Sequence, residues 1–392
     1  MVTKNRKRKI AFLSTYPPRE CGLATFTQDL VNELENMQLL EMPQVIAVSN
    51  EQYTYDKHVI AELNQFDREN YNSLAVRLNK SDIDLLVIEH EYGIFGGESG
   101  EYLIDFIAKL EIPFVTTLHT VLPNPTEKQK KILHLLCKKS AKVVTMAKNT
   151  IDILTGVYDI DLRKIEVIHH GVPLRIVDSR EKLKAKHGYK GKQIISTFGL
   201  ISPGKGLEYG IEAVAKVVKE HDDVLYLVLG QTHPCVKKEM GESYREKLLN
   251  LVSELGIQKH VQFIDKYLTK EEIIQYLQLS DIYMTPYLGK DQAVSGTLAY
   301  AVGYGRVIVS TPYSYAKEML AEGRGLLADF RDSKSLANCI KEILKHPERK
   351  REMENKTMSF GKSMMWNNVA KQYTKLFIDV VERNQSYKER VV

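Results

Sequence analysis

The chain has 392 residues, of which 43% are hydrophobic and 27% charged. These are ordinary values for a globular protein, and the length exceeds what one core usually organises, so two domains are expected. The 55 basic and 50 acidic residues leave a net charge of +5. Five positive charges lie in a short N-terminal tail, namely Lys4, Arg6, Lys7, Arg8 and Lys9. No basic stripe with interleaved aromatic residues recurs, which argues against nucleic acid and leaves peripheral membrane contact open.

Cysteine usage and the N-terminus bear on the compartment. The four cysteines, Cys21, Cys137, Cys235 and Cys339, are far apart and show neither CxxC nor Cys/His spacing. This pattern predicts free thiols in a reducing compartment and no structural zinc. The N-terminus lacks the features of a signal peptide, and no apolar run approaches the roughly 18 residues that a membrane span needs. We therefore expect a cytoplasmic protein with no transmembrane segment.

The first half of the chain alternates between strand-like and helix-like patterns. Ile10–Ser14 reads as a buried strand, followed by a loop with prolines and glycine and by an amphipathic helix to about Met37. Further strands are predicted at Val45–Val48, Leu85–Glu89, Phe114–Leu118, Val143–Met146 and Ile165–Ile168, and helices at Ser99–Leu110, Glu127–Lys138 and Lys148–Val157. Such alternation predicts a parallel sheet with helices on both faces.

The pattern stops at Gly171-Val172-Pro173 and restarts after a charged stretch, 174–192, which we interpret as a linker. The second series of strands is predicted at Ile194–Phe198, Val224–Leu229, Val261–Ile264, Ile282–Met284 and Val307–Val309. Helices are predicted at Gly206–Lys219, Tyr244–Leu255, Lys270–Leu279, Leu298–Tyr304, Lys334–Lys345, Glu348–Lys356 and Trp366–Glu382.

These patterns predict an α/β protein with two facing Rossmann-like, doubly wound domains and a central cleft. The first domain covers 1–173 and the second 193–365, with a C-terminal helix at about 366–392. Ligands bind such sheets beyond the carboxyl ends of the strands. The loops that follow the strands should therefore hold the functional residues.

Two loops of the second domain suit an anion. Gly199–Gly206 nearly matches the phosphate-binding loop of nucleoside triphosphatases. Gly206, however, stands where that loop has a hydroxyl that binds magnesium, which disfavours a nucleoside triphosphatase. Lys205 beside glycines at a helix start still suits a phosphate; the alternative is an ordinary surface lysine. Ser295-Gly296-Thr297 opens a helix of small residues, which is either an anion site or a helix packed closely on the sheet.

Loops of the first domain carry residues that suit sugars. Gly22 lies at a helix start, and His119 follows a strand, although a structural histidine is the alternative there. The loop after Leu85–Glu89 gathers charged, aromatic and glycine residues, including His90, Glu91, Tyr92 and Glu98. Carboxylates and imidazoles bind sugar hydroxyls, and aromatic rings cover the apolar face of a sugar.

Taken in order, these motifs resemble the GT-B glycosyltransferases of family 4, which are retaining enzymes that use nucleotide-sugars. The resemblance spans nearly the whole chain. It rests on the glycine loop Pro17–Phe26, Leu118-His119, Val167–Val172, Phe198-Gly199-Leu200 with Gly204-Lys205-Gly206, Ser280-Asp281 with Pro286, and Gly305–Pro312. Trp366–Glu382 is similar to the family's C-terminal helix, which returns to the first domain.

The resemblance implies roles for individual residues. Lys205 and Gly199 would lie at the donor diphosphate, which would also receive backbone N–H groups from Ser295, Gly296 and Thr297. Gly22 would pass beneath the phosphates, and His119 would contact the transferred sugar near its reacting carbon. Tyr267, in the loop Asp265–Leu268, would border the base. The acceptor would be bound by the stretch after His119 and by His90, Glu91, Tyr92 and Glu98.

Three positions depart from the family pattern. Leu200 stands where an arginine is usual. Gln292 and Tyr300 stand where the family has two glutamates, one beside the sugar and one at the ribose hydroxyls. We still place both residues at the donor. Gln292 keeps the length of a glutamate without its charge, and Tyr300 offers one phenolic group.

The resemblance implies a retaining, metal-independent hexosyltransferase that moves a mannosyl or glucosyl group from a nucleotide-sugar to a saccharide or other hydroxyl acceptor. It implies no cofactor besides the nucleotide-sugar substrate. Two alternatives remain. One is a phosphorylase on the same fold, and the other is a non-catalytic sugar or nucleotide sensor, which the two missing glutamates favour.

Overall fold

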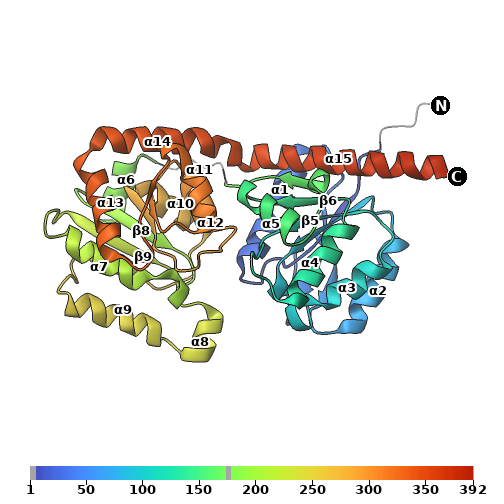
Figure 1. The fold of residues 1–392 in the computed structure, drawn as a ribbon, viewed down its shortest axis with the longest axis horizontal. Helices are drawn as coiled ribbons and strands as arrows, with labels where there is room; N and C mark the ends of the chain where they lie inside the picture. The colour runs from blue at the N-terminus through green and yellow to red at the C-terminus, as the bar shows by residue number, and fades with distance from the viewer. Residues whose placement is uncertain (1–5, 174–177, 392) are drawn as a thin grey trace. The chain divides into compact units, whose positions relative to one another are not determined.

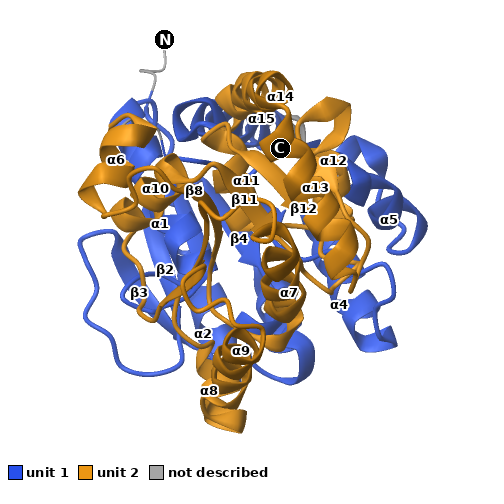
Figure 2. Cartoon of the chain, turned by 90° about the vertical axis from the view of Figure 1, so that its left-hand side faces the viewer, with its two compact units in different colours: residues 1–173, 365–392 blue, residues 174–364 orange. Residues whose placement is uncertain are grey.

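The structure, a computed structural model, describes residues 6–173 and 178–391, with side chains described as far as residue 386. Figure 1 shows the fold, and Figure 2 colours its two compact units. Unit 1 contains residues 1–173 and 365–392, and unit 2 contains residues 174–364. Unit 1 is therefore built from two separate stretches of the chain, whereas unit 2 is continuous.

Unit 1 is organised by a seven-stranded parallel sheet in the order β3-β2-β1-β4-β5-β6-β7. Its strands are β1 (Ile10–Ser14), β2 (Gln44–Ser49), β3 (Val59–Asn64), β4 (Leu85–His90), β5 (Phe114–Leu118), β6 (Lys142–Thr145) and β7 (Ile165–Val167). Its helices are α1 (Gly22–Met37), α2 (Arg68–Asn79), α3 (Tyr102–Lys109), α4 (Glu127–Lys139), α5 (Ile151–Gly156) and α15 (Trp366–Val391). Helices cover both faces, which explains why β1, β4 and β5 are buried along their whole length.

Unit 2 repeats this plan with a six-stranded parallel sheet in the order β10-β9-β8-β11-β12-β13. Its strands are β8 (Gln193–Phe198), β9 (Val224–Leu229), β10 (Val261–Ile264), β11 (Ile282–Thr285), β12 (Val307–Ser310) and β13 (Leu326–Leu327). Its helices are α6 (Arg180–Lys186), α7 (Leu207–Val217), α8 (Pro234–Met240), α9 (Ser243–Glu254), α10 (Lys270–Leu279), α11 (Gly296–Gly303), α12 (Ser314–Met319), α13 (Ser333–Lys345) and α14 (Pro347–Gly361).

In each sheet the strand order reverses once, between β1 and β4 in unit 1 and between β8 and β11 in unit 2. Loops on either side of such a reversal diverge and leave room for a ligand at the carboxyl ends of the strands. The loop after β1 leads directly to Gly22 at the start of α1, the loop after β4 contains residues 91–98, and those after β8 and β11 contain Lys205 and Ser295. The sites predicted from sequence therefore lie where the topology makes room for them.

The alternation of strands and helices predicted from sequence is confirmed, and the differences are local. Residues 180–186, predicted as linker, form α6, whose N-cap Ser179 accepts a hydrogen bond from Lys182 N. Lys184 of α6 is 3% exposed and pairs with Asp281 at 2.7 Å. A buried ion pair thus holds α6 in unit 2. Residues 174–177 of the predicted linker lie outside the described part of the chain.

Helix α15 completes unit 1. Trp366 N donates a hydrogen bond to Val172 O at 2.9 Å, and Phe377 meets Phe12 of β1 with ring centroids 6.1 Å apart. A Cβ added at Gly171 would lie 2.2 Å from the Trp366 ring, so only glycine fits beneath this helix. None of the helices in the described ranges is both long and apolar enough to cross a bilayer.

Candidate functional site

The loop after β8 is held against the loop after β11. Leu288 N donates to Gly204 O at 3.0 Å. Gly206 has φ +59°, and an added Cβ there would lie 2.3 Å from Pro286 O. Both the left-handed backbone and the close approach therefore require glycine at this position. This contact fixes the short turn Pro203–Lys205 at the carboxyl edge of the unit 2 sheet.

Lys205 carries an uncompensated positive charge at this edge. Its ammonium group lies 3.9 Å from the centroid of the Tyr287 ring. Tyr287 is 1% exposed and is stacked on Tyr313 at 5.5 Å, so the ring is a rigid support. No carboxylate within the described part of the chain pairs with Lys205. A cation over an aromatic face is held in place yet keeps its N–H groups available for an anion.

The start of α11 lies beside Lys205. Ser295 caps the helix by accepting from Leu298 N at 3.3 Å, and the hydroxyl of Thr297 lies 3.0 Å from that of Tyr287. A Cβ added at Gly199, where φ is +130°, would be 3.5 Å from Thr297 Cγ2 and 3.9 Å from Lys205 Nζ. Gly199, Lys205 and Thr297 therefore converge. A helix start directs backbone N–H groups and partial positive charge outward, so this arrangement suits a diphosphate.

The other predicted donor residues of unit 2 occupy distinct positions. The amide of Gln292 donates to Val294 O at 3.0 Å, which holds its own loop before α11. Tyr300 is 7% exposed, and its ring centroid lies 6.4 Å from that of Phe198 at the end of β8. Tyr267, in the loop after β10, is 44% exposed. The Tyr267 side chain is thus partly exposed, whereas most of the Tyr300 side chain is packed inside unit 2.

In unit 1, His119 is anchored at the end of β5. Its backbone N–H donates to His90 O at 3.0 Å, and its Nε2 lies 2.8 Å from Oε2 of Glu89. The edge of Phe26 meets the imidazole with centroids 4.8 Å apart. The Glu89 side chain is fully buried, and burial raises its pKa to about 8. Burial also lowers the pKa of His119 to about 3, so the imidazole is not a free cation at neutral pH.

Gly22 begins α1 immediately after the loop that follows β1. Its N-cap is Cys21, whose sulfur accepts from Ala24 N at 3.3 Å. A Cβ added at Gly22 would meet nothing within 4 Å. Protein packing therefore does not require glycine here. Open space at a helix start is compatible with close approach of an anion.

The four predicted acceptor residues differ in exposure. His90 is fully buried between the rings of Tyr92 and Phe95, so its imidazole is not presented to a ligand as the sequence suggested. Tyr92 is 7% exposed. Glu91 is half-buried and accepts hydrogen bonds from Tyr92 N and from the Thr120 hydroxyl. Glu98 is exposed and pairs with Lys128 at 2.7 Å. Glu91 and Glu98 are the two of these side chains that remain accessible.

Sequence reasoning missed Glu89 and Tyr287. A carboxylate near the end of an otherwise apolar strand was the available signal for Glu89, because an isolated buried charge needs a partner. Tyr287 follows Pro286 in a short loop and had no comparable signal. Its contact with Lys205 joins two loops that are far apart in sequence.

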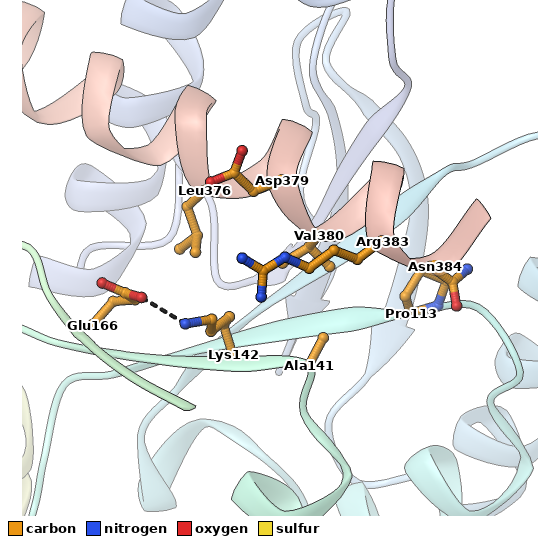
Figure 3. A pocket seen from close by; sticks show the side chains of 9 residues that line it. All are labelled: Pro113, Ala141, Lys142, Glu166, Leu376, Asp379, Val380, Arg383 and Asn384. Carbon is orange, nitrogen blue, oxygen red and sulfur yellow. Dashed lines mark hydrogen bonds and ion pairs between the residues drawn. The ribbon is translucent and has the colours of Figure 1, made fainter. Parts of the chain in front are cut away.

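A separate pocket of about 330 Å³ lies in unit 1 between α15 and the strands β6 and β7 (Figure 3). Lys142 opens β6, and Pro113 immediately precedes β5, so the pocket is at the amino ends of these strands. Lys142 is already paired with Glu166 at 2.6 Å. The pocket is therefore at the opposite edge of the sheet from His119. Among the described residues, no group of three or more His, Cys, Asp or Glu side chains is arranged to hold a metal ion.

Two parallel, Rossmann-like sheets in one chain are the architecture of the GT-B class of glycosyltransferases. The family model described as "Glycosyl transferases group 1" matches residues 179–359, and that described as "Glycosyltransferase Family 4" matches residues 22–175. The chain belongs to the group 1, family 4 glycosyltransferases.

The relatives and solved structures agree with this assignment. The chain is 23% identical to spore coat protein SA of Bacillus subtilis (strain 168), over 62% of this chain and 66% of that protein. It is 24% identical to the D-inositol 3-phosphate glycosyltransferase of Corynebacterium efficiens, over 74% of this chain and 70% of the relative. The chain thus spans about two thirds of these curated relatives. The structure of Anabaena HepE in complex with UDP and glucose has the same fold, with a TM-score of 0.75, 14% identity, and coverage of 95% of this chain and 100% of that one.

Proposed function

We propose that this protein is a retaining hexosyltransferase that transfers a glucosyl or mannosyl group from a nucleotide-sugar to a saccharide or other hydroxyl acceptor. The observation that carries the proposal is the convergence of Gly199, Lys205 and Thr297 at the carboxyl edge of unit 2. The Lys205 ammonium group is supported by Tyr287 but has no carboxylate partner in the described ranges. A doubly charged diphosphate is the ligand that such a site fits best.

The proposed chemistry depends on stabilising the leaving group. As the sugar–phosphate bond breaks, negative charge grows on the diphosphate, where Lys205 and the N–H groups at the start of α11 would stabilise it. A phosphate oxygen of the leaving group then takes the proton of the acceptor hydroxyl on the same face of the sugar, so the anomeric configuration is retained. The Lys205 site supplies positive charge without a metal ion, and we propose that transfer needs no metal or cofactor.

The donor and the compartment are part of the same proposal. A solved structure of the same fold contains UDP and glucose, which makes UDP-glucose the first donor to test, with GDP-mannose beside it. The proposal assigns Tyr267 to the base, and Glu91 and Glu98 to the acceptor. The four cysteines are free thiols, which fits a reducing cytoplasm.

Product analysis by NMR tests this function. The protein is incubated with each nucleotide-sugar and a panel of sugar acceptors, with and without inorganic phosphate and with and without EDTA. We expect a new glycoside with the donor's anomeric configuration and release of nucleoside diphosphate, unaffected by EDTA. A sugar 1-phosphate that forms only when phosphate is added would instead establish a phosphorylase. Binding of a nucleotide-sugar with no turnover would establish a sensor.

A further inference from the structure

The carboxyl ends of β4 and β5 enclose buried polar groups for which the proposed function gives no role. Glu89 lies opposite Thr117 in the register of the two strands, and Tyr373 comes from α15. The Oε1 atom of Glu89, the Thr117 hydroxyl and the Tyr373 hydroxyl are all buried, and the Thr117 hydroxyl acts to lower the pKa of both Glu89 and Tyr373, against the effect of burial. No lysine or arginine in the described residues pairs with Glu89. Its one ionisable partner is His119, at 2.8 Å.

This pairing leaves one nitrogen of His119 for a ligand. Nε2 is occupied by Glu89, and the ring is held edge-on by Phe26. The Nδ1 atom has no partner in the described part of the chain, and the side chain is 12% exposed. An imidazole fixed through one nitrogen presents the other in a defined direction and, if the proton is also fixed, with a defined hydrogen-bonding role.

We propose that Glu89 is a positioning residue that keeps the His119 ring in the tautomer with hydrogen on Nδ1, so that this N–H donates to a hydroxyl oxygen of the transferred sugar. The inference rests on the proposed function, because it is the nucleotide-sugar that supplies this oxygen. Glu89 itself touches no substrate. Its effect is transmitted through the bond between its carboxyl group and Nε2.

The state of the proton follows from burial. Burial raises the pKa of Glu89 to about 8 and lowers that of His119 to about 3. At neutral pH the pair therefore carries one proton between Oε2 and Nε2 and no net charge. The shared proton can lie nearer to Oε2 of Glu89 or nearer to Nε2 of His119. In both cases Nδ1 of His119 carries its own hydrogen. An ionised Glu89 would instead accept from Nε2–H, and Nδ1 would become an acceptor.

Other titratable groups surround the pair and set its pH response. They come from β4 and its following loop, from the segment that follows β7 and from helices α1 and α15, and they are His90, Glu91, His170, Asp29 and Tyr373. The charge of Glu91 raises the pKa of His119, which opposes the effect of burial. The pKa of the Tyr373 phenol is raised by burial and by the charge of Glu89, so it stays neutral. Glu89 is thus the group in this cluster that titrates slightly above neutral pH.

The test compares two substitutions at Glu89. Glu89→Gln keeps a neutral donor that can bond Nε2, whereas Glu89→Leu removes the bond. We expect Glu89→Leu to lower kcat about tenfold or more with a smaller change in donor KM, and Glu89→Gln to restore most of that loss. The kcat of the natural protein should fall as pH rises through about 8, and the kcat of Glu89→Gln should not. Equal losses in the two variants, or no loss in either, would overturn the proposal.

Thr116→Val is the matched control for a change in buried polarity. Thr116 immediately precedes Thr117 on β5, and its hydroxyl forms a hydrogen bond with the Ser140 hydroxyl at 2.8 Å. Because side chains alternate along a strand, this change affects the other face of the sheet. It should lower the melting temperature without altering the pH profile of kcat.

A second readout does not depend on catalysis. Long-range ¹H–¹⁵N NMR of protein labelled at histidine, with His119→Gln used for assignment, reports which ring nitrogen carries hydrogen. We expect Nδ1–H in the natural protein at pH 7. A resonance showing hydrogen on Nε2 alone would overturn the proposal. If the natural protein transfers no sugar, the proposed function fails, and the NMR result still decides the role of Glu89.

Discussion

The Lys205 side chain is supported by Tyr287, which follows the neighbouring strand β11. The Tyr287 ring supports the ammonium group at 3.9 Å, and Tyr313 is stacked behind that ring. Since no carboxylate competes for the charge within the described residues, the lysine is available to the ligand. Neither aromatic contact could be predicted from the near-match to a phosphate-binding loop, which concerns Gly199–Gly206 alone. The sequence predicts a phosphate-binding role for Lys205, but it does not predict the aromatic rings that support the side chain.

Replacing Lys205 should affect turnover and not folding. We expect Lys205→Ala to raise the barrier to sugar transfer by about 2–4 kcal/mol, because one preorganised charge partner of the leaving diphosphate is lost. The steady-state kcat/KM with the best donor measures this. Lys247→Ala, which removes an exposed lysine side chain of α9, is the control and should leave kcat/KM unchanged. Near-normal kinetics of pure Lys205→Ala would exclude Lys205 from the site.

Among the helices, α11 combines a capped start with small residues in its first turn. Ser295 accepts from Leu298 N, and Gly296 and Thr297 follow. The sequence left two explanations for this stretch, an anion site or close packing. Thr297 lies next to the Gly199–Lys205 loop, which favours the anion site.

A bulky side chain at the start of α11 separates the two explanations. Gly296→Val should weaken binding of the nucleoside diphosphate at least tenfold, because the branched side chain blocks its approach to the helix N–H groups. Isothermal titration with UDP and GDP measures this. Gly156→Val is a matched glycine-to-valine change at the end of α5, where an added Cβ meets nothing within 4 Å, and it should not alter binding. Unchanged affinity of Gly296→Val would leave packing as the explanation.

Helix α6 shows how a charged stretch becomes an ordered element. Asp281 is 3% exposed and accepts from Ile194 N at 2.8 Å, while Lys184 and Lys350 pair with it at 2.7 and 2.9 Å. Arg180 adds a contact at 3.5 Å. Lysines of α6 and α14 are thereby attached to the start of β11. The charges of α6 read as a solvated linker in the sequence, since the buried aspartate that pairs with Lys184 lies about a hundred residues away.

Removing the central carboxylate should destabilise unit 2. Asp281→Asn leaves buried lysines unpaired, so we expect a loss of about 3–5 kcal/mol in its free energy of unfolding. The lysine pairs lower the pKa of Asp281 in the folded state. Its contribution is therefore present above the unfolded pKa and is lost as pH falls through the folded pKa. Urea unfolding at pH 7 and at acidic pH measures both effects.

The control for Asp281 is an exposed pair of the same unit. Glu352→Gln breaks the contact with Lys356 on α14 and should cost much less stability, because both side chains are exposed and solvent screens the pair. A loss in Asp281→Asn as small as this would show that the buried network does not stabilise unit 2.

Several strands and helices match their predicted bounds residue for residue. Phe114–Leu118, Val224–Leu229, Val261–Ile264 and Lys270–Leu279 have the predicted bounds. Strand β3 was missed because it lies at the edge of its sheet and alternates between exposed and half-buried residues. Helix α2 was missed because its sequence is mostly polar and only four of its residues are buried. Apolar runs and helical periods in the sequence identify most elements, whereas β3 and α2 lack a clear pattern of this kind.

Pairings between side chains were the main part of the site that sequence could not predict. His119 was predicted at a strand end, and it lies there. Its bond to Glu89 depends on the register of β4 against β5, which puts residues 30 positions apart in contact. The burial of His90 has the same origin, since the rings of Tyr92 and Phe95 close over it.

At the scale of the whole molecule, the two units differ in how the chain builds them. Unit 2 is continuous, with its own sheet and core, whereas unit 1 needs α15 from the other end of the chain. We expect a fragment of residues 174–364 to fold cooperatively and to bind nucleoside diphosphate. A fragment of residues 1–173 should be much less stable, because it lacks Trp366, Tyr373 and Phe377. Circular dichroism during thermal unfolding tests both fragments, and a stable 1–173 fragment would contradict this account.

Because unit 1 is built from two separate stretches of the chain, its two parts are synthesised at different times. Ribosomes release the chain from its N-terminus, and domains generally fold as units as they emerge. The strands of unit 1 are made first, yet the helix that covers Phe12 and seats Trp366 over Gly171 is made last. Unit 2 can therefore finish folding while unit 1 still lacks part of its core. In the nascent protein, the sheet of unit 1 is made before that of unit 2 but is covered by α15 only after unit 2 has been made. Until α15 packs, the uncovered apolar surface of unit 1 is open to chaperones.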